Sequence, residues 1–290
     1  MIVALAVDVF SPLFSVRDPL SWGVRKTFIL PTPRTVIGAL CRGVGVVMGF
    51  GSGEEKLGNK PIRKILTYAF EKNTIATVHA LSPIIRSSQL LHIVPEIEQG
   101  ASYGGGDAFK HEIMCSNQLR LIYIIDLSGV NTFLKKHKQS MSVNHNALEK
   151  ASNFIERLGA SENICTVLKS RLVKPQVIKN GSVSVNTYVP LNWLRDPPEG
   201  GLIAESMPNI AVIESIEGRK IDFRTAFRKE YRLRKAPYFY PLKPEKTERG
   251  TLVYHTHEIE VSLRNGFVGM EFKELDSKII VPKGMIEGAV

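Results

Sequence analysis

The sequence predicts an α+β fold, and three observations carry this prediction. Short apolar runs of branched residues recur along the chain in the lengths typical of buried strands. Stretches with apolar residues at helical spacing lie between some of these runs in residues 1–175. Residues 176–290 contain further strand-like runs, separated by loops rich in proline, glycine and charge. We therefore expect a mixed first region, residues 1–175, and a β-rich second region, residues 176–290.

The first two expected elements are a strand and a helix joined by a basic linker. Residues 1–10 form an apolar run with Asp8 as its only charge, which predicts a short buried strand. In residues 33–48 apolar side chains recur at helical spacing, Thr32 is a suitable N-cap, and Pro33 suits the first helical turn. Several glycines weaken this helix and indicate that it packs closely on a sheet or lets another chain approach.

The start of this helix is a candidate anion site. The first N–H groups of a helix lack partners and its dipole is positive at that end. Arg25, Lys26 and Arg34 flank it here. These residues alone leave two interpretations open, a phosphate-binding site and a solvated basic loop in front of a core helix.

The remaining elements of the first region follow in order. We expect a loop at 49–61, a short helix at 62–70, a strand at 73–85, a projecting hairpin or finger at 86–117, a strand at 117–127, a charged connector or short helix at 130–143, a helix at 145–160 and a strand at 163–173. Three glycines in series, Gly104 to Gly106, indicate the projecting finger. The order strand, helix, strand, strand, helix, strand predicts a ferredoxin-like βαββαβ core, an arrangement that RNA-recognition domains share with many other folds.

Composition and charge limit the classes of function. The 290 residues are 43% hydrophobic and 23% charged, which is typical of a globular protein. The net charge of +10 favours a polyanionic partner or an anionic surface. Cys41, Cys115 and Cys165 are far apart and form no CxxC, which argues against a disulfide framework and fits a reducing compartment. Because no apolar run has the length of a membrane span and no signal peptide is recognisable, we expect a cytoplasmic protein without membrane contact.

Residues 219–249 form the most basic stretch of the chain. Eleven lysines and arginines face four acidic residues there, with six aromatic residues interleaved. Cations for phosphates and aromatic faces for bases favour contact with single-stranded nucleic acid or with an acidic protein. The alternative is a solvated helix over residues 222–235 with its aromatic residues in the core.

Few residues suggest catalysis or metal binding. Lys110 and His111, beside the glycine run, could supply a cation and a base to a metal-independent ribonuclease. We favour the simpler interpretation of a basic tip that grips an RNA backbone. His255 and His257 would share one face of a strand, but two ligands without a third do not predict a metal site. No P-loop, GxSxG or HExxH motif occurs, so we expect neither a cofactor nor a metal.

Several segments together resemble the Cas-five family, the RAMP-superfamily subunits of type I CRISPR effector complexes (Cascade). An apolar first strand is followed by Arg25-Lys26-Thr27, and PTPRTVIGAL then opens a glycine-bearing helix, as in the N-terminal signature of the family. DAFKHEIMCSNQLRLIYIID resembles the return of a protruding thumb into a central strand. ERLGASENICTVLKSRL resembles the second helix and the strand after it. The resemblance covers roughly residues 1–175, and the length of the second region suits the archaeal type I-A branch.

The resemblance implies a ferredoxin-like core with a thumb at about 86–117 and a β-rich C-terminal region. It implies a non-catalytic CRISPR RNA-binding subunit that caps the 5′ handle in antiviral defence. Such a subunit contacts the backbone subunit and the large subunit of Cascade, and through them target DNA. The implied RNA-binding residues are Arg25, Lys26, Thr32, Arg34, Thr35, Arg86, Lys110 and His111.

Two other functions stay open from the sequence. In the type I-C branch a relative cuts the CRISPR repeat RNA with a tyrosine, a lysine and a histidine, and Lys110 and His111 match that pair in kind. The tyrosine has no clear counterpart, because Tyr68 and Tyr103 are the only candidates. A metal-independent endoribonuclease is therefore the second hypothesis. The third is a basic scaffold that binds an acidic protein.

Overall fold

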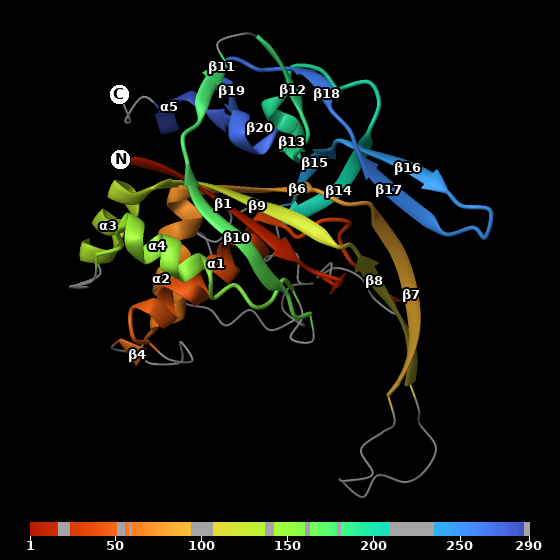
Figure 1. Ribbon diagram of the computed structural model, residues 1–290, viewed down its shortest axis with the longest axis horizontal. Coiled ribbons are helices and arrows are strands. Elements are labelled where there is room, and N and C mark those ends of the chain that lie inside the picture. The colour runs from red at the N-terminus through yellow and green to blue at the C-terminus, as the bar shows by residue number, and fades with distance from the viewer. Residues whose placement is uncertain are drawn as a thin grey trace, which may run out of the picture.

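The computed structural model describes nine stretches of the chain. They are residues 1–16, 24–50, 56–57, 60–93, 107–136, 142–159, 163–178, 181–208 and 235–286. Within them the chain combines helices with mainly antiparallel sheets, which confirms the mixed α and β class. Figure 1 shows a central sheet with helices on one side and a group of short strands on the other.

A four-stranded antiparallel sheet forms the centre of the molecule. Its strands are β1 (Ile2–Phe10), β6 (Thr74–Ala80), β9 (Gln118–Asp126) and β10 (Thr166–Val173). They lie in the order β10-β1-β9-β6. Alternate residues of β1 and β9, such as Leu5, Val7 and Leu121, are fully buried on one face, where the main core lies. All four strands lie within segments in which the sequence predicts strands.

Four helices cover this buried face. They are α1 (Pro33–Val47), α2 (Ile62–Asn73), α3 (Leu127–Lys136) and α4 (His145–Ser152). The Thr32 hydroxyl accepts a hydrogen bond from the Thr35 N–H at 3.3 Å and caps α1, as the sequence predicts. The apolar face of α1, which includes Val36, Ile37 and Leu40, is buried in the main core. The connector predicted at residues 130–143 begins inside α3.

Helix α4 is shorter than the sequence predicts. The periodicity predicts a helix over residues 145–160, but α4 ends at Ser152. Ile155 and Leu158 are buried nevertheless, because the chain continues in a non-helical segment that packs both side chains into the same core. Gly159, with φ of 99°, forms a bridge to Ser15 in this segment instead of ending a helix. The apolar spacing therefore predicts the buried residues correctly and their backbone wrongly.

One glycine of α1, Gly43, allows close contact with the neighbouring helix α4. A Cβ at Gly43 would lie 2.0 Å from the carbonyl oxygen of Ala151 in α4. We expect Gly43→Ala to lower the free energy of unfolding by about 1–3 kcal/mol, because the two backbones must move apart. Gly38→Ala is the matched control, since nothing lies within 4 Å of a Cβ at this position. It should raise the free energy of unfolding by about 1 kcal/mol, because alanine has the higher helix propensity. Equal stability of the two variants in urea denaturation would contradict this packing.

A second sheet carries the projecting hairpin. Its strands are β2 (Leu13–Phe14), β3 (Val24–Arg25), β7 (Ile84–Ile93), β8 (Asp107–Cys115), β16 (Leu242–Lys246) and β17 (Leu252–Thr256). The order is β16-β17-β7-β8-β2, and β3 runs parallel to β8. Strands β7 and β8 form the long arm that projects from the body in Figure 1. The predicted finger at residues 86–117 is this hairpin, although Gly104 to Gly106 lie outside the described residues.

The described residues of the second region contribute several small antiparallel pairings. Two of them are three-stranded, β11-β19-β20 and β13-β15-β14, and one is the pair β12-β18. The bounds are β11 (Gln176–Ile178), β12 (Ser182–Val185), β13 (Val189–Pro190), β14 (Leu202–Pro208), β15 (Lys235–Tyr240), β18 (Ile259–Ser262), β19 (Phe267–Phe272) and β20 (Ser277–Pro282). Strand β17 of this region pairs with β7, so the second region also braces the hairpin.

Short elements complete the described chain. They are β4 (Lys56–Leu57), β5 (Lys60–Pro61), the 3₁₀ turns η2 (Leu191–Trp193) and η5 (Lys273–Leu275), and α5 (Lys283–Ile286). Residues 222–234 of the predicted second-region helix lie outside the described residues. Among the described helices, none combines the length and the apolarity that crossing a membrane requires.

Candidate nucleic-acid interface

The root of the hairpin brings together four positions that the sequence singles out. Strand β3 runs parallel to β8, with Val24 opposite Lys110 and Arg25 opposite His111. Lys26 follows Arg25 and is exposed. Residues 25 and 26 are far from residues 110 and 111 in sequence, yet β3, which ends at Arg25, lies beside β8. The side chains of Arg25 and Lys110 lie outside what the structure describes.

His111 is part of the packed root of the hairpin. It is 7% exposed, and its Nε2 lies 2.9 Å from the hydroxyl oxygen of Ser15. The next residue, Glu112, accepts a hydrogen bond from the Thr27 N–H at 3.3 Å. The Thr27 hydroxyl in turn accepts a hydrogen bond from the Val16 N–H at 2.7 Å. These contacts fasten the linker before α1 to β8, so His111 belongs to a structural junction and not to an exposed tip.

The linker ends at a rigid helix start. Thr32 is buried, and its hydroxyl is used in the cap of α1. Two buried tyrosines brace this end: Tyr188 donates from its hydroxyl to the Pro31 carbonyl at 3.2 Å, and Tyr123 to the Val36 carbonyl at 3.0 Å. Burial raises the pKa of both phenols well above the ordinary value, so both remain donors. Thr32 thus fixes the geometry of the site and is too buried to form much of its surface.

Arg34, in the first turn of α1, has a buried counter-charge. Its Nε lies 3.3 Å from Oε1 of Glu71 in α2; the guanidinium side chain is 51% exposed and the carboxylate side chain 3% exposed. Burial raises the pKa of Glu71 to about 7, and the charge of Arg34 acts in the opposite direction. An exposed guanidinium at a helix N-terminus suits an anion, and Glu71 limits the free positive charge of Arg34. Thr35 beside it is half-buried.

Arg86 lies farther from this group than the sequence suggests. In β7 it is opposite Met114, whereas His111 is opposite Gln89, three residues along the strand. That offset is roughly 10 Å at the rise of a strand. The guanidinium carbon of Arg86 lies 5.8 Å from the centre of the Tyr254 ring. Arg86 is therefore half-buried against β17 and stands apart from the junction of β3 with β8.

The part of the basic stretch that the structure describes does not form a base-stacking surface. Tyr238, Phe239 and Tyr240 are buried, because they lie in β15, the middle strand of β13-β15-β14. The exposed cations are Lys243 and Lys246 in β16 and Arg249 in the following turn. Residues 219–234 lie outside the described residues. The prediction that aromatic residues and cations share one surface is therefore wrong for residues 235–249, where the aromatic side chains pack inside.

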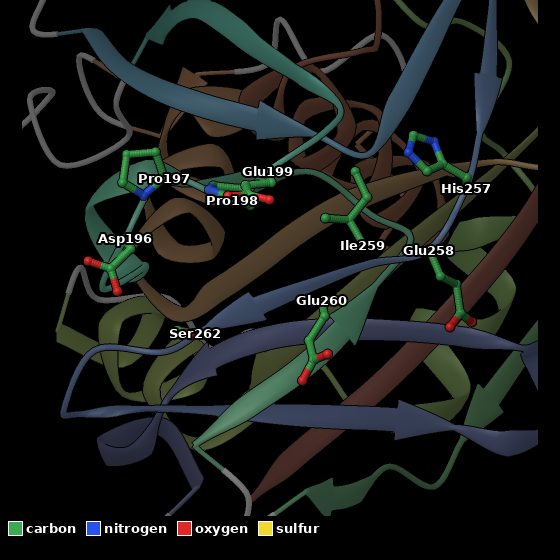
Figure 2. Close-up of a pocket in the computed structure, with 9 residues that line it drawn as sticks. All are labelled: Asp196, Pro197, Pro198, Glu199, His257, Glu258, Ile259, Glu260 and Ser262. Carbon is green, nitrogen blue, oxygen red and sulfur yellow. The ribbon is translucent and has the colours of Figure 1, made fainter.

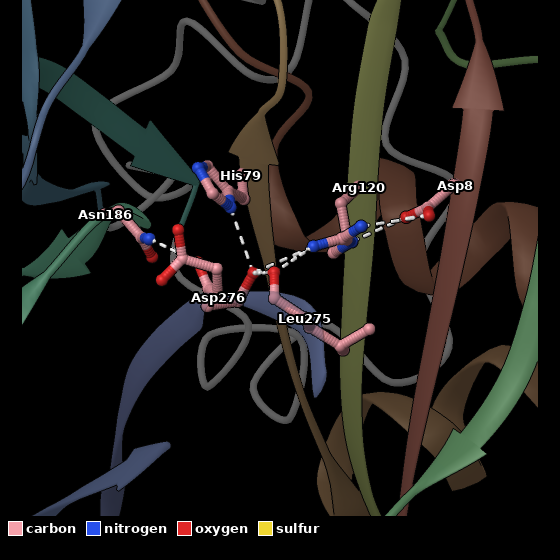
Figure 3. Close-up of polar contacts among 7 residues, drawn as sticks. Asp8, His79, Arg120, Asn186, Leu275 and Asp276 are labelled. Carbon is pink, nitrogen blue, oxygen red and sulfur yellow. Dashed lines mark hydrogen bonds and ion pairs between the residues drawn. The ribbon is translucent and has the colours of Figure 1, made fainter. Parts of the chain in front are cut away.

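A buried polar cluster that the sequence analysis did not predict lies on one face of the four-stranded sheet. Figure 3 shows Arg120 of β9 between Asp8 of β1 and the chain at Leu275. Arg120 Nε and Nη2 bind the two carboxylate oxygens of Asp8 at 2.6 and 3.0 Å, and Nη1 donates to the Leu275 carbonyl. His79 Nδ1 lies 2.9 Å from the Ser277 hydroxyl. Burial, reinforced by the charge of Arg120, lowers the pKa of His79 to about 4.

This cluster belongs to a larger covering of the sheet. The face opposite the helices is packed against β19, η5 and β20 in a second apolar core, where Ala6, Ile122, Phe272 and Val281 are buried. RNA-recognition domains expose the corresponding face of their sheet and stack bases on it. Most of that face is unavailable in this chain. Asp8 within an apolar strand was the one sequence signal of the cluster, and its partner Arg120 lies 112 residues away.

A hollow elsewhere on the surface is lined by acidic residues, in contrast to the basic residues of the candidate interface. Its volume is about 570 Å³. Figure 2 shows Asp196, Glu199, Glu258 and Glu260 around it. A hydrogen bond from Ser184 and the contact with Lys278 lower the pKa of Glu258. Carboxylates in this number disfavour a phosphate ligand. We therefore leave the hollow out of the candidate nucleic-acid interface.

The two histidines noted in the sequence have different neighbours. His257 lines the acidic hollow, whereas His255 Nε2 contacts the Glu245 carboxylate at 3.3 Å. Within the described ranges no group of three histidine, cysteine or acidic side chains could hold a metal ion.

Comparisons with known proteins were made by sequence and by fold. No family model matches the chain. By sequence it is 24% identical over 192 residues, 64% of this chain and 70% of the relative, to the CRISPR-associated protein Cas5 of Methanocaldococcus jannaschii. By fold it aligns with a CRISPR protein from Archaeoglobus fulgidus at a TM-score of 0.54 and 16% identity, covering 97% of this chain and 99% of the other. A chain of a CRISPR RNA-guided surveillance complex has a TM-score of 0.31, too low to indicate a shared fold.

Proposed function

Because this chain is similar in sequence to the CRISPR-associated protein Cas5 and in fold to a CRISPR protein, we propose that it is a non-catalytic CRISPR RNA-binding subunit of a type I effector complex. In this role it caps the 5′ handle of the CRISPR RNA and contacts the backbone and large subunits. Its place of action is the cytoplasm, without a membrane partner. The net charge of +10 supports a polyanionic ligand.

The topology supports a ferredoxin-like core for this subunit. Numbered along the sequence, the four strands of the central sheet lie in the order fourth, first, third, second, with all neighbours antiparallel. Helices α1 and α2 connect the first strand to the second, and α3 and α4 connect the third to the fourth. This succession agrees with the βαββαβ order. The hairpin β7-β8 is then an insertion between the second and third strands.

One observation carries the RNA-binding proposal most directly: the parallel pairing of β3 with β8. It sets Arg25 and Lys26 beside Lys110 at the root of a projecting hairpin. The linker then leads through Thr27 and the buried Phe28 to the capped start of α1, where Arg34 is exposed. A strand of RNA that follows this linker would meet cations at both ends and a positive helix terminus.

The packing of His111 supports the non-catalytic role. A general base for RNA cleavage must reach the 2′-hydroxyl of the substrate. His111 is instead 7% exposed and lies against Ser15 inside the junction. We therefore assign Lys110 and His111 to gripping and structure, and not to cleavage.

The proposal is tested by titrating labelled CRISPR repeat RNA in EDTA at two salt concentrations, on native and denaturing gels. We expect intact RNA and an affinity that falls with salt. Lys26→Gln should weaken binding and reduce the salt slope by about 0.7, the value for one phosphate contact on a single strand. Lys283→Gln, an exposed lysine in α5, is the matched control and should change neither.

Each contrary outcome selects a different function. Cleavage in EDTA that His111→Ala abolishes would favour the endoribonuclease and overturn the non-catalytic role. An absence of salt-dependent RNA affinity would overturn the RNA-binding proposal and favour a scaffold for an acidic protein.

A further inference from the structure

An exposed aromatic side chain lies at the end of the central sheet that the second core leaves uncovered. Phe10, the last residue of β1, is 41% exposed. It points to the same face as Ala4, Ala6 and Asp8, since side chains alternate along a strand. Ala4 and Ala6 are buried under the second core, which ends before it reaches Phe10.

The direct cross-strand neighbours of Phe10 are polar, and an exposed leucine, Leu168, lies nearby at a bulge in β10. Across the sheet, Phe10 lies opposite Gln118 of β9 on one side and Thr166 of β10 on the other, and both residues are exposed. Two residues earlier in β1, Asp8 lies opposite Lys169. Lys169 is exposed and forms no ion pair with the described residues. Arg120 neutralises Asp8 through two hydrogen bonds. The surface around Phe10 therefore presents an aromatic ring beside the positive charge of Lys169.

Phe10 also lies next to the root of the hairpin. The chain leaves β1 at Phe10, and the Ser11 N–H donates to the Asn117 carbonyl at 3.2 Å. It then enters β2 beside β8, and Ser15 contacts His111. The stretch from Phe10 to Ser15 spans at most roughly 17 Å in an extended chain. That length corresponds to a few nucleotides of the strand proposed to bind at the root.

We propose that Phe10 stacks against a base of single-stranded RNA and that Lys169 binds a neighbouring phosphate. This inference rests on the proposed function and adds a second contact point to it. An exposed ring on a sheet, with cations beside it, is the arrangement by which proteins hold single strands. A protein partner would bury a contiguous apolar surface. The exposed apolar side chains here, Phe10 and Leu168, are accompanied by the exposed polar residues Gln118, Thr166 and Lys169, which favours RNA.

The experiment compares Phe10→Ala, Phe10→Leu and Phe10→Trp in binding to labelled CRISPR repeat RNA. We expect Phe10→Ala to weaken binding roughly tenfold, within the range for one stacked base, with an unchanged salt slope. Leucine keeps an apolar side chain but lacks an aromatic face. Phe10→Leu should therefore bind as weakly as the alanine variant. Phe10→Trp should retain the affinity, and its added tryptophan emission should be quenched by RNA. Lys169→Gln should lower the salt slope by about 0.7.

Phe154→Ala is the matched control. Phe154 is 42% exposed and follows α4, on the helical side of the sheet, so its removal should leave RNA affinity unchanged. The proposal is overturned if Phe10→Ala binds as tightly as the parent protein, if Phe10→Leu retains full affinity, or if Phe154→Ala loses as much. Loss of self-association in Phe10→Ala without loss of RNA affinity would assign the ring to a protein contact instead. If the parent protein lacks RNA affinity altogether, the proposed function fails together with this inference.

Discussion

Replacing Arg120 by methionine is expected to lower the free energy of unfolding by about 3–5 kcal/mol, the range for a buried ion pair that loses one partner. Asp8 would keep a carboxylate that is 17% exposed without its counter-charge. The Leu275 carbonyl and the Ser277 hydroxyl would each lose a donor. The loss should be visible in urea denaturation as a lower midpoint with an unchanged slope.

Two further variants make the Arg120 result specific. Arg42→Met removes one partner of an exposed ion pair with Glu156, whose atoms lie 3.0 Å apart, and should cost no more than about 1 kcal/mol. The double variant Asp8→Leu with Arg120→Met should be more stable than Arg120→Met alone, because no buried charge is left without a partner. If Arg120→Met were as mild as Arg42→Met, the cluster would not hold the second region on the sheet.

The parts of the fold predicted correctly from sequence depend on local signals. The start of α1 follows from Thr32 and Pro33, which act within one turn of the helix. The strands β1 and β9 follow from apolar runs that are buried on both faces. The glycine run at residues 104–106, from which the sequence predicts a hairpin or finger, lies between β7 and β8 along the chain. In each case the physical cause lies within a few residues of the element.

The errors arise where distant segments decide the structure. The 3-4-3 spacing extends beyond α4, but Gly159 meets Ser15 and the chain leaves the helix early. Tyr238 and Tyr240 appear as aromatic residues in a basic stretch, yet both rings pack edge-to-face against Tyr188 at 5.6 and 5.9 Å. The Asp8–Arg120 pair spans 112 residues. Neither periodicity nor composition reports which distant residue will be the partner.

The same limit applies to the candidate site. Arg25, Lys26 and Arg34 were chosen because they flank one helix start, a local argument that the linker geometry supports. The proximity of Arg25 to positions 110 and 111 depends on the register of β3 against β8, which no local pattern encodes. The burial of His111 depends on Ser15, which lies 96 residues earlier. Residue types therefore suggest a ribonuclease pair at positions 110 and 111, and packing separates the His111 side chain from solvent.

The pH dependence of stability should change in opposite directions when Glu71 and His79 are replaced in turn. Burial raises the pKa of Glu71 from 4.5 to about 7, so its contribution to stability is present below pH 4.5 and is lost as pH rises to 7. Burial lowers the pKa of His79 from 6.5 to about 4, so its contribution is present above pH 6.5 and is lost as pH falls to 4. Each change is worth about 3 kcal/mol, and between pH 4.5 and 6.5 the two largely cancel.

Glu71→Gln leaves only the His79 effect, so its free energy of unfolding, relative to that of the parent protein, should rise between pH 4.5 and 6.5. His79→Asn, which keeps a hydrogen-bonding group for Ser277, should show the reverse trend. Urea denaturation at constant ionic strength in steps of pH measures both, and all other carboxylates contribute equally to the three proteins. Parallel curves for the three proteins would mean that neither group is perturbed by its burial. Opposite slopes would show that the helix packing around Glu71 and the sheet covering around His79 respond to acid in opposite ways.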